Sequence, residues 1–214
     1  MKKTIILVSG NAGAGKDTVF GMIKDLIPDI RQYTFAASLK HIVKDLSKIF
    51  LNAEFDVESM NSLEYKEAIR PEFTVYDQNG PRPLSIRHLL QNIGTEVMRN
   101  HLGADVFINA TLDQIESDPD EKVVAITDLR FPNELSRVRQ FCSEKRYKLI
   151  VIKVRRSSIE SGYHESEKNI DKLPCDWIIE NNQGLEDLRE QVREIVRHAL
   201  WSFVGHRYVS TLSS

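Results

Sequence analysis

The chain has 214 residues and carries 29 basic and 31 acidic side chains, which give a formal net charge of −2 at pH 7. This near balance leaves no broad positive face for long nucleic acid or for an anionic membrane surface. The length suits one sizeable α/β domain with a large insertion, and the hydrophobic fraction of 41% is that of an ordinary globular protein.

The cysteines and the N-terminal segment indicate a reducing compartment. Cys142 and Cys175 lie far apart and outside any metal-ligand spacing. The apolar run Thr4–Val8 is too short for the core of a signal peptide and leads into glycines rather than a cleavage site. No segment approaches the ~20 apolar residues of a membrane span. We therefore expect a cytoplasmic protein.

Short apolar runs typical of buried parallel strands alternate with helical patterns. The runs are Thr4–Ser9, Gln32–Ala36, Lys122–Thr127, Lys148–Val154 and Trp177–Glu180. Helical periodicity covers Gly15–Leu26 and Leu185–Trp201. This alternation predicts an α/β fold with a five-stranded, mostly parallel sheet and helices on both faces.

A long insertion separates the second strand from the third, where a plain crossover needs only about a dozen residues. Its helical patterns are Leu39–Phe50, Ile86–His101 and Asp105–Glu116, and a Pro/Gly-rich connector lies at Asp77–Pro83. We expect a core domain formed by residues 1–36 and 118–204 and a mainly helical, substrate-binding insertion at residues 37–117. Within the core we expect a lid at residues 155–170, and beyond it a flexible tail at residues 205–214.

A glycine-rich turn follows the first strand directly and leads directly into the first helix. Gly10, Gly13 and Gly15 permit positive φ angles, so that successive N–H groups and the helix N-terminus point at one anion. Lys16 then reaches the β and γ phosphates as a mobile positive charge. This order of elements predicts the phosphate loop of a P-loop NTPase. The residues expected to bind ATP are Asn11, Gly13, Ala14, Gly15, Lys16, Asp17 and Thr18.

Asp17 stands where the general pattern of such loops has a Ser or Thr hydroxyl on Mg²⁺. A carboxylate at this position either holds Mg²⁺, directly or through water, or caps the helix. Both interpretations agree with a negative charge in the first helical turn. Our hypothesis is that Asp17 is linked to the metal.

The third strand runs into Asp128 and Arg130, and Asn133 and Glu134 begin the next helix. Ligands bind at the carboxyl ends of the strands in such a sheet, so we expect Asp128 and Arg130 to face the glycine-rich turn. Asp128 would orient Mg²⁺ or its waters, and Arg130 would meet an acceptor or γ phosphate. The alternative is a solvated helix cap.

Two arginines, Arg155 and Arg156, follow the fourth strand. They either close over the triphosphate and neutralise charge on the transferring group or belong to a solvated basic loop. The sequence does not separate the roles of the two. His164, farther along the lid, is expected to form hydrogen bonds rather than act as a base, because transfer to a phosphate acceptor needs none.

Motifs along nearly the whole chain resemble the deoxynucleoside monophosphate kinases of tailed bacteriophages, a branch of the nucleoside monophosphate kinase-like P-loop fold. The motifs are Gly10–Thr18, Phe35–Lys40, Leu90–Glu96, Asp128–Glu134, His164–Glu167 and Asp176–Asn181. Asp17 is the residue that this family has at its position. Ser38 departs from the family, which usually has Pro there, and this affects the expected local turn but not Lys40.

The resemblance implies that the insertion binds a deoxynucleoside monophosphate. Lys40 and Arg70 would hold its phosphate, although Lys40 also suits a plain helix surface. The residues implied to line the base, the sugar and the rest of the acceptor site are Gln91, Gly94, Thr95, Glu96, Arg130, Asn133 and Glu134. A glycine inside a helical pattern has either a packing or a contact reason, and for Gly94 we favour contact with the ligand. Arg70 precedes Pro71, which favours presentation from a turn.

These features predict transfer of the ATP γ-phosphate to a deoxynucleoside 5′-monophosphate. The catalytic residues are expected to be Lys16, Asp17, Asp128, Arg130, Arg155 and Arg156, with Asp17 and Asp128 as the metal ligands. The expected partners are small-molecule nucleotides, a homodimer is one assembly open to the chain, and the location is the host cytoplasm if the protein is encoded by a phage.

Two alternatives stay open. The Gly-Lys-Asp sequence, Tyr65–Arg70 and Asp176–Asn181 also resemble animal-type phosphomevalonate kinase, but Gln91–Glu96 and Phe131–Glu134 match the nucleotide branch better. A nucleotide-binding subunit without transfer activity is the other alternative. The acidic pair beside an arginine argues against it, since a pure binder has little need of one.

Overall fold

The computed structural model describes residues 3–157 and 170–200. Contacts divide the chain into two compact units. The core unit takes in the chain up to Thr34 and from Thr111 onward, and the insertion unit is Phe35–Ala110. Most of the expected lid and the whole expected tail, together with His164, lie outside the described residues.

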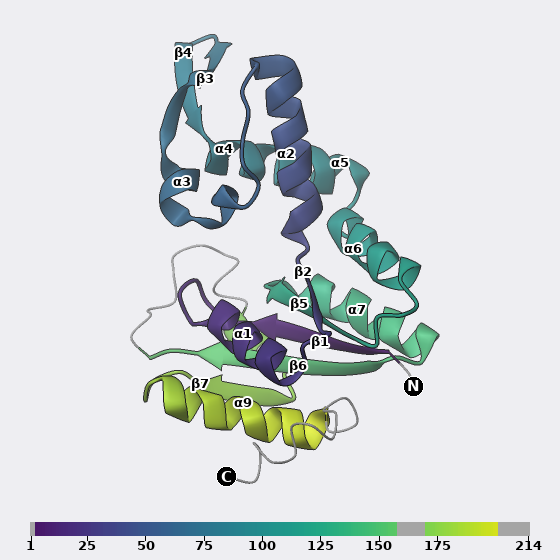
Figure 1. The fold of residues 1–214 in the computed structure, drawn as a ribbon. Helices are drawn as coiled ribbons and strands as arrows, with labels where there is room; N and C mark the ends of the chain where they lie inside the picture. Colours follow the sequence, from purple (N-terminus) through teal and green to yellow (C-terminus); the bar gives the residue numbers. More distant parts are fainter. Residues whose placement is uncertain (1–2, 158–169, 201–214) are drawn as a thin grey trace. The chain divides into compact units, whose positions relative to one another are not determined.

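A parallel sheet forms the centre of the core unit (Figure 1). Among the described residues its strands are β1 (Thr4–Ser9), β2 (Arg31–Tyr33), β5 (Val123–Leu129), β6 (Lys148–Arg155) and β7 (Trp177–Glu180). They lie in the order β2-β5-β1-β6-β7, and every neighbouring pair is parallel. The predicted parallel sheet is therefore confirmed. The second strand ends at Tyr33 rather than Ala36, because Ala36 begins the next helix.

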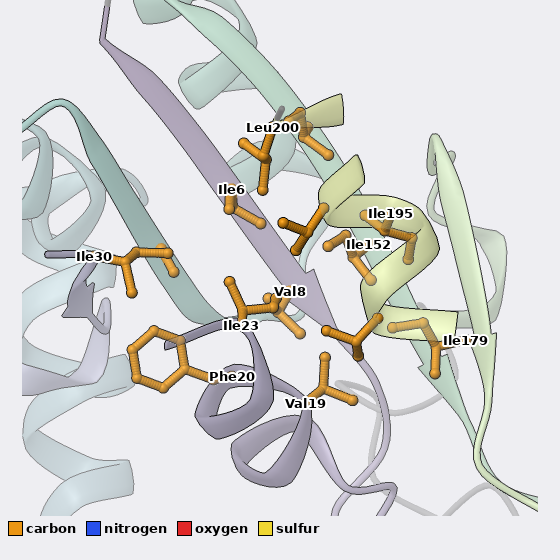
Figure 2. Packing of buried hydrophobic residues seen from close by; sticks show 14 of the residues in the cluster. Ile6, Val8, Val19, Phe20, Ile23, Ile30, Ile152, Ile179, Ile195 and Leu200 are labelled. Carbon is orange, nitrogen blue, oxygen red and sulfur yellow. The ribbon is translucent and has the colours of Figure 1, made fainter. Parts of the chain in front are cut away.

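Helices cover both faces of this sheet, as predicted. Helices α1 (Lys16–Leu26) and α9 (Leu185–Ala199) pack on one face, and α7 (Pro132–Lys145) lies across the sheet from them (Figure 1). Figure 2 shows the buried cluster between the sheet and helices α1 and α9, which includes Ile6 and Val8 of β1, Ile23 of α1 and Ile195 of α9. Every residue of β1 is buried, as expected of a central strand covered on both faces.

Helix α6 (Val106–Ser117) passes from the insertion unit into the core unit. We expected the insertion to end at residue 117, whereas the contacts end it at Ala110. Buried Leu112 and Ile115 explain the difference, together with Lys3, whose ammonium donates hydrogen bonds to the carbonyls of Ile115 and Asp118 at the end of the helix. None of the helices that the structure describes is long and apolar enough to cross a membrane.

The insertion unit contains helices and a β-hairpin. Its elements, in chain order, are α2 (Ala36–Leu51), the 3₁₀ turn η1 (Ser59–Asn61), α3 (Leu63–Glu67), β3 (Ile69–Asp77), β4 (Gly80–Ser85), α4 (Ile86–Gln91), the π-helix η2 (Asn92–Arg99) and α5 (Asn100–Leu102). The expected connector at Asp77–Pro83 is wrong, because Gly80–Pro83 belongs to β4. Prolines conceal this strand in the sequence, but a strand at the edge of a two-stranded sheet has N–H positions that need no partner.

A small aromatic core holds the insertion unit together. Phe73 of β3 is fully buried, and its ring lies 4.5 Å from that of Phe55 at 68° in an edge-to-face arrangement. Val43 and Met60 are also fully buried in the same cluster. The hairpin therefore packs against the helices through Phe73.

We predict that Phe73→Ala lowers the free energy of unfolding by about 3–5 kcal/mol, because it removes a buried ring and leaves a cavity. Tyr76→Ala is the matched control on the same strand, since Tyr76 is 82% exposed; its effect should stay within about 0.5 kcal/mol. Urea denaturation followed by circular dichroism measures both. Equal losses in the two variants would contradict the packing role of Phe73.

Candidate active site

The glycine-rich turn between β1 and α1 has the backbone that its sequence predicts. Gly10, Gly13 and Gly15 have φ angles of 155°, 76° and 102°. Helix α1 begins at Lys16, and the N–H groups of its first turn have no acceptor within the helix. These amides and the positive end of the helix dipole form a cradle for an anion at the carboxyl end of β1.

Two of these glycines also allow close approach by neighbouring strands. A Cβ atom at Gly10 would lie 2.6 Å from the carbonyl oxygen of Val154 on β6. At Gly15 it would lie 2.5 Å from Nδ2 of Asn181, which follows β7. A larger side chain at position 10 would displace the loop from β6, and one at position 15 would displace the side chain of Asn181.

Lys16 lies along the loop rather than away from it. Its Nζ donates hydrogen bonds to the carbonyls of Gly10, at 2.7 Å, and Asn11, at 2.9 Å. The positive charge is thus held at the same turn as the amides. Asp17 and Thr18 are exposed in the first turn of α1, where a ligand in the cradle can reach them.

A β-bulge marks the end of β5 beside this loop. Leu7 of β1 pairs with Ile126, but Ser9 pairs with Leu129, so β5 has one extra residue at Thr127–Asp128. Bulges bend a strand and redirect its side chains. Asp128 therefore leaves the regular ladder on the strand next to β1, at the edge where the loop begins.

Glu134 supports the turn that carries Arg130. The carboxylate is only 3% exposed, and its Oε2 accepts hydrogen bonds from the N–H groups of Arg130, at 2.8 Å, and Phe131, at 3.0 Å. This oxygen closes the N-terminus of α7, a role that we did not predict. Arg130 itself is exposed at the carboxyl end of β5.

A cavity of about 590 Å³ adjoins the phosphate loop within the core unit. Gly13, Gly15 and Thr18 form its loop side, and the segment from Asn181 to Leu188 forms the opposite side. The structure separates the two arginines, because Arg156 lines this cavity whereas Arg155 lies 3.7 Å from the carboxylate of Glu180. Sequence reasoning missed Asn181 and Asn182 as site residues, although their position directly after β7 is the signal that could have found them.

Within the insertion unit, Lys40 and Arg70 are held by neighbouring side chains. Nζ of Lys40 donates a hydrogen bond to Oδ1 of Asn61 at 2.5 Å. The Arg70 guanidinium lies 4.4 Å from the ring centre of Tyr65 and 3.6 Å from the Glu72 carboxylate, and its buried Nε has no hydrogen-bond partner. Arg70 belongs to strand β3, not to the expected turn.

The segment with Gln91, Gly94, Thr95 and Glu96 includes most of the π-helix η2, a conformation that occurs frequently at functional sites. Gln91, Thr95 and Glu96 are exposed, but Gly94 is buried. A Cβ atom there would lie 2.6 Å from Cδ2 of Leu39, so packing against α2 accounts for this glycine. Gly94 thus has a packing contact, and the ligand contact that we favoured for it stays a prediction.

A family model supplies the remaining observation. The model for deoxynucleotide monophosphate kinase matches residues 43–192, more than half of the chain. The chain belongs to the deoxynucleotide monophosphate kinase family. Because the match begins after the phosphate loop, the loop geometry is independent support for the binding of a nucleotide phosphate. With the central parallel sheet and the loop after β1, the kinase has the α/β P-loop fold predicted from its sequence.

The chain is similar to several solved structures, two of which are kinases. Shikimate kinase from Acinetobacter baumannii in complex with shikimate is 16% identical with a TM-score of 0.44, over 94% of this chain and 95% of that one. An APS kinase mutant from Mycobacterium tuberculosis is 12% identical with a TM-score of 0.39, over 92% and 96%. A plasmid partition protein from Borrelia burgdorferi is 14% identical with a TM-score of 0.34, over 92% and 99%. No curated protein matches the chain.

The oxygen atoms at the loop suit the needs of Mg²⁺ bound with a nucleotide. Asp17 lies in the first turn of α1, after the loop that leaves β1, and Asp128 lies at the bulge near the end of β5, the strand beside β1. Oδ1 of Asn11 in the loop is buried and has no hydrogen-bond partner. No group of three or more His, Cys, Asp or Glu side chains arranged for a metal occurs in residues 3–157 and 170–200. Mg²⁺ bound with a nucleotide keeps several waters and takes one or two carboxylates together with substrate phosphates.

We predict that Glu134→Ala destabilises the kinase by about 1.5–3 kcal/mol, because two backbone N–H groups lose a buried, charged acceptor. Glu134→Gln keeps an acceptor oxygen and should recover part of that loss. Glu144→Ala, an exposed position on the same helix, is the control. Thermal denaturation of the three variants measures the effect, and an unchanged melting temperature in Glu134→Ala would contradict the capping role.

Proposed function

We propose that this kinase transfers the γ-phosphate of ATP to a deoxynucleoside 5′-monophosphate and releases ADP and a deoxynucleoside diphosphate. The family match over residues 43–192 carries this conclusion. The phosphate loop with Lys16 supplies a donor site that agrees with it. A phosphomevalonate kinase and a subunit without transfer activity are disfavoured by the same match.

The donor nucleotide lies with its triphosphate on the loop and its nucleoside in the adjoining cavity. Leu185 offers an apolar surface to a base, and Asn182 offers a polar group to its edge. Arg156, on the same cavity, is placed to contact the base or the ribose. A volume of about 590 Å³ is within the range of small-molecule sites.

Transfer to a phosphate acceptor depends on position and charge rather than on a base. An oxygen of the monophosphate attacks the γ phosphorus, the bond from that phosphorus to the β–γ bridging oxygen breaks, and ADP leaves with the electron pair. Lys16, Arg130 and Arg155 reduce the repulsion between the two anions. Glu134 contributes by fixing the backbone of Arg130.

Asp17 and Asp128 would hold Mg²⁺, directly or through water. When bound, the ion supplies charge neutralisation between the β and γ phosphates. The motif resemblance also supports a bacteriophage source, and with it the host cytoplasm as the location.

The monophosphate binds to the insertion unit in this proposal. Lys40, held by Asn61, and Arg70, held against Tyr65, grip its phosphate, since guanidinium groups match phosphate oxygens in pairs. Exposed Gln91, Thr95 and Glu96 are placed to contact the base and sugar. For Asn133, at the start of α7 in the core unit, the family resemblance alone supports a role in binding the acceptor.

A coupled assay of ADP release tests the function directly. We predict turnover with at least one of dAMP, dCMP, dGMP and dTMP, and none with phosphomevalonate. Lys16→Met should lower kcat by at least about 100-fold, because it removes the positive charge that stabilises the transferring phosphoryl group. Lys24→Met, at the far end of α1, is the control. Failure of every monophosphate to turn over would refute the proposal.

A second prediction concerns the acceptor site. Arg70→Lys should raise KM for the monophosphate by about 10-fold, because lysine keeps the charge but loses the paired donors and the stacking on Tyr65. KM for ATP should not change. Arg82→Lys on β4 is the control in the same unit, and an equal rise in both KM values for Arg70→Lys would exclude a specific role in acceptor binding.

A further inference from the structure

Asn181, the residue after β7, connects the end of that strand to the phosphate loop and to the end of β6. Its side-chain Nδ2 donates a hydrogen bond to the carbonyl oxygen of Ala14 at 2.9 Å. Its backbone N–H donates to the carbonyl of Arg155 at 2.8 Å. Because the backbone of Asn181 is fixed to the end of β6, its side chain reaches the phosphate loop from a rigid support.

The hydrogen bond to Ala14 determines how one peptide of the loop is oriented. In a planar trans peptide, the C=O of one residue and the N–H of the next point in opposite directions. When Asn181 holds the Ala14 oxygen, the N–H of Gly15 therefore points away from Asn181. The N–H of Ala14 donates to the carbonyl of Asn11 at 3.1 Å, which closes the turn from its other end.

Gly15 and Asn181 fit each other sterically. A Cβ atom at position 15 would lie 2.5 Å from Nδ2 of Asn181, so only glycine admits the side chain. The absence of a Cβ also makes rotation of the Ala14–Gly15 peptide easy, since glycine adopts many backbone conformations. A rotated peptide would turn the Ala14 oxygen, the negative end of its dipole, toward the anion. A hydrogen bond that fixes the Ala14–Gly15 peptide therefore acts where the loop rotates most easily.

We propose that Asn181 is a positioning residue whose amide holds the Ala14–Gly15 peptide in the orientation that presents the Gly15 N–H, and not the Ala14 oxygen, to the donor phosphates. This inference rests on the proposed function, because it takes ATP as the ligand of the loop. Asn181 acts on the phosphates through the backbone.

Asn182 provides a matched comparison. It lines the same cavity, but its Oδ1 accepts a hydrogen bond from the N–H of Ser157 at 2.8 Å instead of contacting the phosphate loop. A substitution at Asn182 thus changes the cavity wall without freeing the Ala14 carbonyl. Comparing substitutions at Asn181 and Asn182 therefore distinguishes an effect on phosphate binding by the loop from an effect on nucleoside binding in the cavity.

Calorimetric titration of the full chain with ATP, inorganic tripolyphosphate and adenosine tests the proposal. Asn181→Ala should weaken binding of tripolyphosphate and of ATP by about 10-fold, whereas the dissociation constant for adenosine should change less than about 2-fold. Asn181→Asp keeps the size of the side chain but replaces the donor with an acceptor, and it should lose at least as much. Asn182→Ala should bind tripolyphosphate like the wild type.

Unchanged tripolyphosphate binding in both Asn181 variants would overturn the positioning role while leaving the proposed function intact. Equal losses for adenosine and tripolyphosphate would also overturn it, since they would indicate a general disturbance of the site. A wild-type protein that binds neither ATP nor tripolyphosphate would overturn both this inference and the proposed function. Circular dichroism and the melting temperature of each variant confirm that the folded protein is being compared.

Discussion

The active site depends on one constraint: the backbone of Gly10–Thr18 must turn several N–H groups toward a single anion. Left-handed φ angles at Gly13 and Gly15 make this turn possible, and the start of α1 adds its dipole. The loop leaves β1, the middle strand of the sheet, so it is anchored on both sides. Neighbouring strands β5 and β6 then bring Asp128 and Arg155 to the same edge.

The parts of the fold that depend on local sequence were predictable. Unbroken apolar runs predict the buried parallel strands, and the spacing of glycines between a strand and a helix predicts the phosphate loop. The hairpin of the insertion unit escaped prediction because Pro81 and Pro83 look like loop residues, and only the pairing with β3 shows that they lie on an edge strand.

Contacts between distant residues were beyond the reach of sequence patterns. Ala14 and Asn181 stand 167 positions apart, and nothing near either residue indicates their hydrogen bond. Gly94 packs against Leu39 of α2, and nothing near either residue in the sequence indicates this contact. The sequence places Glu134 close to Arg130, but it does not indicate that the carboxylate accepts hydrogen bonds from two backbone amides.

In the proposed donor site the loop amides themselves bind the phosphates of ATP. Amide NMR spectra of the ¹⁵N-labelled protein, recorded during titration with ATP, test this most directly. We predict downfield shifts of the Gly13, Gly15 and Lys16 amide protons, as expected when an N–H donates to a charged oxygen. Saturation with ATP without any change in these three signals would show that the loop amides do not bind the phosphates.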